Sequence, residues 1–236
     1  MSSASDTATV LADLLAALDK SKLPDEPEPR EPVGEFVYSF LLDDAPQTRA
    51  DHAYKRVTDA VLGWNELRVS TPDDVALLLG KTYPNVAERS ERLTRAMDHV
   101  FRAEHELSLA PAMELSKRDG RKYLESLDGM TPFVAARVSL LVLGAHAAPV
   151  DERIRSALAA AGAIEPDLDC ERASAKLERA IKSADGVRAH AKLVAWADDP
   201  GSGPAVGRPK SRPTGSAGPS KKRTTRKKTT KRPSKR

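Results

Sequence analysis

The most informative part of the sequence is YLESLDGMTPFVAARVSLLVLGAHAAPVDERIRSALAAA, residues 123–161. A helical pattern ends at Leu127, a four-residue turn that contains Gly129 follows, and a strongly apolar helix starts at Pro132. A short loop then delivers Asp151 to the start of the next helix. The stretch therefore predicts two helices joined by a tight hairpin, with an aspartate at a loop-to-helix junction nearby.

The segments on both sides of this stretch also have helical periodicity. Apolar residues recur every three or four positions, Ala and Leu dominate, and no segment shows the alternation of a half-buried strand. We therefore predict an all-α fold, with helices near residues 6–19, 36–42, 49–64, 72–80, 86–106, 118–127, 132–143, 151–161, 171–183 and 187–196.

Composition divides the chain into four parts. An amphipathic helix occupies residues 1–20, and a proline-rich acidic linker occupies residues 21–34. A helical domain follows in residues 35–198, with its hairpin at 128–131. Residues 199–236 are rich first in Gly, Ser and Pro and then in Lys and Arg, so we expect them to be disordered.

Charge is distributed unevenly between the body and this tail. Residues 201–236 contain thirteen Lys and Arg and no acidic residue, which leaves 25 basic against all 34 acidic residues in 1–200, a formal charge of about −9. Small basic clusters without acids resemble the tails of linker-histone-like proteins and suit phosphate binding without sequence reading. The candidate phosphate contacts are Lys221, Lys222, Arg223, Arg226, Lys227, Lys228, Lys231 and Arg232. A solubilising tail or an address signal is the alternative.

Several classes of site are excluded at this stage. The single Cys170 rules out an intramolecular disulfide and a four-cysteine zinc or iron–sulfur site. His52 and His105 lie in helical patterns without a second metal ligand at i+4, and we predict no metal and no cofactor. No apolar run is long enough to cross a bilayer, and nothing reads as a signal peptide. We expect a monomer in the cytoplasm, associated with the nucleoid, or in the nucleus of a eukaryote.

Residues 123–161 resemble the helix-hairpin-helix and Gly/Pro-Asp segment of the endonuclease III-like DNA glycosylases. The family hairpin reads approximately Leu-Pro-Gly-Val-Gly and its distal loop ends in Val-Asp; here the matching residues are 127–131 and then Val150 and Asp151. The likeness extends over about residues 35–197. It implies a two-lobed helical domain with a DNA cleft, double-stranded DNA as the partner, and base-excision repair as the process.

Three hairpin positions depart from the family pattern. Asp128 stands where the family has proline, Thr131 replaces the second glycine, and Phe133 replaces the lysine nucleophile of the bifunctional enzymes. A carboxylate at 128 opposes a phosphate contact unless it turns away. Without the lysine no Schiff base forms there, so the resemblance gives no support for strand cleavage. The family's iron–sulfur cysteines are also absent.

Asp151 is the candidate catalytic residue. A carboxylate near the sugar stabilises the oxocarbenium character that develops when the bond to the base breaks. Asp after Pro-Val is also a good helix N-cap, and the two roles are compatible. The candidate DNA contacts outside the tail are Gly129, Met130, Thr131, Gln47 and His146.

Three functions therefore stay open. The first is a monofunctional DNA glycosylase, or a lesion-binding relative without activity. The second is a non-catalytic architectural protein that uses the hairpin domain and a histone-like tail. The third is a protein-interaction domain that the tail tethers to the nucleoid. Asp128, Thr131 and Phe133 favour the non-catalytic functions, and Val150 with Asp151 favours the first.

Overall fold

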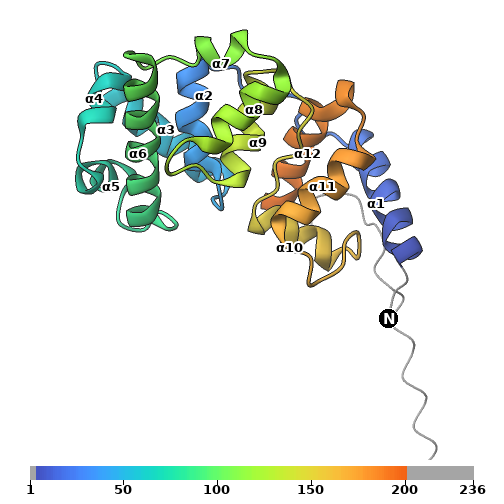
Figure 1. Ribbon diagram of the computed structural model, residues 1–236. Helices are drawn as coiled ribbons and strands as arrows, with labels where there is room; N and C mark the ends of the chain where they lie inside the picture. The colour runs from blue at the N-terminus through green and yellow to red at the C-terminus, as the bar shows by residue number, and fades with distance from the viewer. Residues whose placement is uncertain (1–3, 201–236) are drawn as a thin grey trace, which may run out of the picture.

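The computed structural model describes residues 4–200, and within that range every regular element is helical (Figure 1), as predicted. The elements are α1 (Ala4–Asp19), α2 (Pro32–Leu42), α3 (Gln47–Ala60), α4 (Trp64–Val69), α5 (Pro72–Leu79), α6 (Val86–Glu104), α7 (Ala110–Glu114), α8 (Lys117–Ser126), α9 (Pro132–Leu141), α10 (Glu152–Ala160), α11 (Cys170–Ala180), the 3-10 turn η1 (Ser183–Asp185) and α12 (Gly186–Asp198). The basic tail lies outside the described residues.

The helices form two lobes (Figure 1). One contains α2–α9, and the other joins α1 to α10–α12, so that the two ends of the described chain share a lobe. Helix α1 packs on α12 through Leu11, Leu14 and Leu18, which are all buried. A single apolar cluster runs through both lobes. Burial of this shared core fixes the lobes relative to each other and positions the residues at their junction.

The predicted helix over 49–64 is wrong at its C-terminal end. Helix α3 stops at Ala60, Val61 is extended, and a separate short helix, α4, begins at Trp64. The intervening Leu62 is fully exposed and Gly63 is extended, so the apolar stripe that suggested one helix continues across a break. Helix α7 was not predicted, because its five residues are too few to show a helical period.

Candidate functional site

The predicted hairpin joins α8 to α9 and packs against α6. Gly129 has φ +85°, a conformation that favours glycine, and a Cβ there would overlap the backbone carbonyl of Arg92. Glycine is thus required both by the turn and by its close approach to α6. Met130 is half-buried and lines a cavity beside the hairpin.

Asp128 turns away from the hairpin surface toward α6. Its carboxylate pairs with Arg95, which lowers the pKa of Asp128, and its amide donates to His99 Nδ1 at 3.0 Å. The amide of Gly129 also hydrogen-bonds to Asp128. The sequence left open whether this carboxylate faces the DNA; in the structure an arginine compensates it, and two hairpin amides have partners inside the protein.

Thr131 connects the hairpin to the turn after α2. Its hydroxyl caps α9 by accepting from the Val134 amide at 3.1 Å, and it donates to Asp43 Oδ2 at 2.8 Å. The side chain is buried. The Thr131 hydroxyl therefore links the start of α9 to the turn after α2. A glycine at this position could not make these bonds.

Asp151 is the N-cap of α10, at the junction of the lobes. Its Oδ1 accepts from the Ile154 amide at 2.8 Å, which confirms the predicted N-cap. Its Oδ2 accepts from the Asp44 amide at 3.2 Å, and Asp44 Oδ1 accepts in return from the Glu152 amide at 2.9 Å. Arg153 lies 3.7 Å from the same carboxylate. These reciprocal bonds hold the buried Asp151 in one position, and burial raises its pKa.

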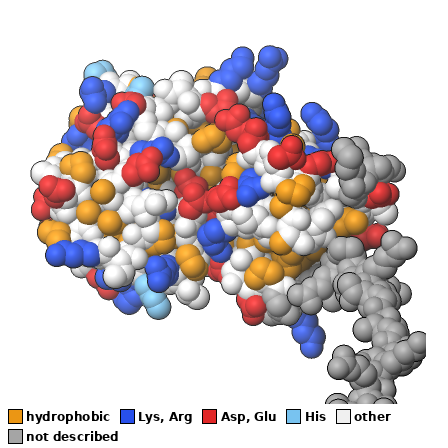
Figure 2. All heavy atoms as spheres, turned by 90° about the horizontal axis from the view of Figure 1, so that it is seen from below, with side chains coloured by type: hydrophobic (Ala, Val, Ile, Leu, Met, Phe, Trp, Pro, Cys, Tyr) orange, Lys and Arg blue, Asp and Glu red, His pale blue; other side chains and the backbone are white. Residues whose placement is uncertain are grey.

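The turn after α2 brings two further carboxylates to this junction. Burial raises the pKa of Asp43 to about 6, with a smaller contribution from the negative charges of Asp44 and Asp151, while Thr131 and Arg89 act in the opposite direction. Arg89 is buried and donates to the backbone carbonyl of Asp43. Figure 2 shows acidic side chains gathered in the middle of the face where the two lobes meet.

Two cavities flank this group of residues. One of about 210 Å³ is lined by Asp43, Asp44, Arg89, Arg92 and Thr131, together with residues of α2 and α6. The other, of about 450 Å³, lies between the hairpin and α11, and Thr131 lines it as well. A cavity on each side of the hairpin gives the junction room for a ligand.

The remaining candidates are placed as follows. Gln47 begins α3, and its amide donates to Asp198 at 2.9 Å. Asp198 also pairs with Arg153, so Gln47 is linked to Asp151 through two charged residues. His146 is exposed and contacts the carbonyl of Glu178 at 2.7 Å, away from the carboxylates. The eight tail residues lie outside the described range.

Cys170 does not have the character of a reactive thiol. Burial and the neighbouring Glu152 carboxylate raise its pKa to about 11. Sequence reasoning missed Asp43, Asp44 and Arg89. The available signal is the Asp43-Asp44 pair directly after the apolar helix that ends at Leu42. Among residues 4–200, no cluster of His, Cys, Asp and Glu has metal-site geometry, and no helix is long and apolar enough to span a membrane.

No protein-family model and no curated protein matches this sequence. Solved structures do match. An endonuclease III–DNA covalent intermediate superposes with a TM-score of 0.63 at 12% identity over 83% of this chain and 86% of that chain. A thermostable thymine-DNA glycosylase gives 0.58 at 15% identity over 82% and 87%. The H. pylori 3-methyladenine DNA glycosylase MagIII gives 0.58 at 13% identity over 81% and 96%. The chain therefore has the endonuclease III-like fold that its hairpin predicted.

Proposed function

From an endonuclease III-like fold with a rigidly held carboxylate at the lobe junction, we propose that the protein binds double-stranded DNA and removes damaged bases. The proposal is base-excision repair by a monofunctional DNA glycosylase with Asp151 as the catalytic carboxylate. The observation that carries it is the hydrogen bonding of Asp151 by the Ile154 and Asp44 amides at the junction of the lobes. The similar structures include DNA glycosylases bound to DNA or to a modified base.

The reaction is hydrolysis of the N-glycosidic bond. The bond between C1′ of the sugar and the base nitrogen breaks, and the base leaves with the electron pair. Water then adds to C1′, and the proton that it loses ends on the departed base. A carboxylate close to the sugar stabilises the positive charge that develops there, and fixed hydrogen bonds remove the cost of orienting it during the reaction. Phe133, where the bifunctional enzymes have lysine, is buried against His190 and offers no amine for a covalent intermediate.

DNA affinity would come from two regions. The tail supplies thirteen positive charges without an acid and is the main non-specific component. In the body, α8 begins with exposed Lys117 and Arg118, whereas Arg92 and Arg95 beside the hairpin are paired with carboxylates of their own lobe. Since Asp128 is neutralised by Arg95, the hairpin face does not carry the repulsion that its sequence suggested.

The test compares two aspartates that cap helices. Asp151→Asn keeps an N-cap but removes the charge, and Asp169→Asn does the same at α11, where Asp169 accepts from the Arg172 amide at 2.7 Å. Both variants are incubated with duplexes that contain a panel of damaged or mismatched bases, and abasic sites are then cleaved chemically. We expect Asp151→Asn to lose base release by about 100-fold or more, and Asp169→Asn to retain it. Full activity in Asp151→Asn would remove this residue from the mechanism.

A second function is favoured by one specific observation. The carboxylate of Asp151 is buried and already has several partners, and the hairpin amides of Asp128 and Gly129 have partners within the chain. A site whose groups are all satisfied also suits a non-catalytic DNA-binding or architectural protein. Tight, salt-dependent DNA binding by the wild type, without base release on any duplex of the panel, would select this function.

A further inference from the structure

The turn that follows α2 places a second aspartate, Asp43, close to Asp151. Asp44 connects the two, because its amide donates to Asp151 Oδ2 at 3.2 Å and because it lines the same cavity of about 210 Å³ as Asp43. The negative charge of Asp151 also contributes to the raised pKa of Asp43. Asp43 thus faces an open space that borders the immediate surroundings of Asp151.

The carboxyl group of Asp43 has an incomplete set of partners. Its Oδ2 accepts from the Thr131 hydroxyl at 2.8 Å, and its Oδ1 has no hydrogen-bond donor within residues 4–200. Arg89 donates to the backbone carbonyl of Asp43, and no side chain of the described range forms an ion pair with the carboxyl group itself. One oxygen of Asp43 is therefore left for a ligand in the cavity.

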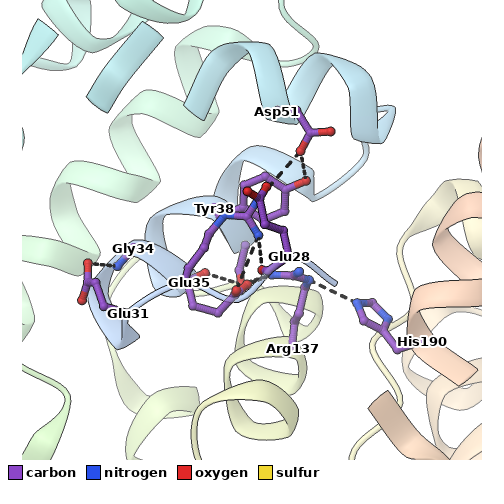
Figure 3. A network of polar contacts seen from close by, with 10 residues as sticks. Glu28, Glu31, Gly34, Glu35, Tyr38, Asp51, Arg137 and His190 are labelled. Atoms are coloured by element: carbon purple, nitrogen blue, oxygen red, sulfur yellow. Dashed lines mark hydrogen bonds and ion pairs between the residues drawn. The ribbon is translucent and has the colours of Figure 1, made fainter. Parts of the chain in front are cut away.

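A second group of buried ionisable side chains, around Arg137, is built differently (Figure 3). Glu35 pairs there with Arg137, which is fully buried and also donates to Ser39 at 2.9 Å and to His190 at 3.1 Å. A guanidinium thus balances the charge of Glu35, as is expected of a buried carboxylate that stabilises the fold. No ion pair of this kind accounts for the position of Asp43.

The surroundings of Asp43 and Asp151 also differ in how they treat a proton. At Asp151, two backbone amides and Arg153 offset part of the burial that raises the pKa. At Asp43, the Thr131 hydroxyl and the charge of Arg89 oppose burial and the nearby carboxylates only partly, and the pKa lies at about 6. Near neutral pH Asp43 is therefore present in both forms, as a group that donates a proton and takes one back must be.

The charge of the leaving base decides whether such a group is needed. A carboxylate beside the sugar stabilises the cation that forms at C1′, but it does not neutralise the base that departs. An alkylated base such as 7-methylguanine carries a positive charge and leaves as a neutral molecule. A neutral base such as hypoxanthine leaves as an anion unless an acid protonates it, so its release gains from a carboxylic acid next to the base.

We propose that Asp43 is a second catalytic residue, a general acid that protonates the leaving base, and that the substrates are electrically neutral bases. The proposal rests on the proposed function, in which Asp151 stabilises the sugar. Asp43 gives its proton to a ring nitrogen of the base while the C1′–N bond breaks, and the electron pair of that bond stays with the base, which leaves neutral. Water adds to C1′, and the proton that it loses returns Asp43 to the acid form.

The test compares a neutral and a cationic base in the same duplex. Wild type, Asp43→Asn and the control Asp167→Asn, in the exposed loop before α11, release hypoxanthine or 7-methylguanine under single-turnover conditions between about pH 5 and about pH 7.5. We expect wild type to release hypoxanthine about tenfold more slowly for each pH unit above about 6, and 7-methylguanine without this dependence.

The variants should divide in the same way. Asp43→Asn should reduce hypoxanthine release by about 100-fold or more, and 7-methylguanine release by a factor that is at least about tenfold smaller. Asp151→Asn should reduce the release of both bases by similar factors, because Asp151 acts on the sugar. Asp167→Asn should follow wild type with both bases.

Several results would overturn the assignment of Asp43 while the proposed function stands. One is an equal loss on the two bases in Asp43→Asn. Another is release of 7-methylguanine alone by wild type. A third is hypoxanthine release by wild type that does not fall above about pH 6, which needs no variant and is therefore decisive even if Asp43→Asn folds poorly. If wild type releases no base at all, the proposed function fails and the role of Asp43 fails with it.

Discussion

Asp43 gives the candidate site a pH signature that can be measured without a substrate. Its pKa is about 6 in the folded protein, against 3.8 for the free side chain, because the carboxyl is buried between the lobes. The folded state therefore binds the proton more tightly than the unfolded state. The free energy of unfolding should fall as pH rises from about 4 to about 6 and then stay level with respect to this group. A shift of about two pKa units corresponds to about 3 kcal/mol.

Asp43→Asn tests this reasoning because asparagine can still accept from the Thr131 hydroxyl but does not ionise. We expect the variant to gain stability relative to wild type as pH rises, by about 1 to 3 kcal/mol between about pH 4 and pH 7.5. Urea unfolding followed by circular dichroism at several pH values gives the difference directly. Any pH-independent change that the amide makes to the free energy of unfolding cancels when the differences at two pH values are compared.

The control is Asp167→Asn, which changes an exposed carboxyl in the loop before α11. Its stability difference from wild type should not vary with pH in the same way. Asp151, whose pKa is also raised by burial, acts in the same direction as Asp43, so wild type with both aspartates should show the steeper dependence. If the stability difference between Asp43→Asn and wild type is flat from about pH 4 to pH 7.5, the carboxyl is not held in an environment that opposes its charge.

Two further predictions concern the tail and the core. Deletion of residues 207–236 should flatten the salt dependence of DNA binding by about five to six units of log–log slope, if half of the thirteen charges engage phosphates; an unchanged slope would assign the binding to the acidic body. Glu35→Gln should destabilise the protein by about 3 to 5 kcal/mol, because Arg137 stays buried without its carboxylate. Adding Arg137→Met should recover much of that loss of stability, as measured by chemical denaturation. No recovery would mean that the unpaired Arg137 is not the cause of the destabilisation.

The hairpin and the Asp151 cap could be predicted because both depend on local sequence. The turn at Gly129 can be inferred from a glycine between two helical patterns. The cap can be inferred in the same way from an aspartate that precedes a new apolar stripe. The same holds for most helix boundaries. The break after Ala60 was missed because Val61 and Trp64 continue the apolar spacing of α3, so periodicity alone could not locate it.

The surroundings of the site could not be predicted because they depend on long-range contacts. Asp44 is 107 positions from Asp151, and Thr131 is 88 positions from Asp43, yet each pair is joined by a hydrogen bond. The linker presented a different difficulty. Its prolines and acids predict an extended segment, which is consistent with the structure, but only the fold shows that Arg30 enters a pocket between Tyr38 and Glu35.

The departures of the hairpin from the family pattern are connected in space. Thr131 is buried and gives its hydroxyl to Asp43, while the exposed Asp128 pairs with Arg95 of α6, so both replacements make contacts within the α2–α9 lobe. Phe133, the third replacement, packs beside His190, which in turn accepts from Arg137. A lysine at 133 would bring an ammonium close to the buried Arg137, where like charges repel strongly. A lysine at 133 is therefore poorly compatible with the buried Arg137, and the positive charge that α9 places at the lobe junction lies in the middle of the helix.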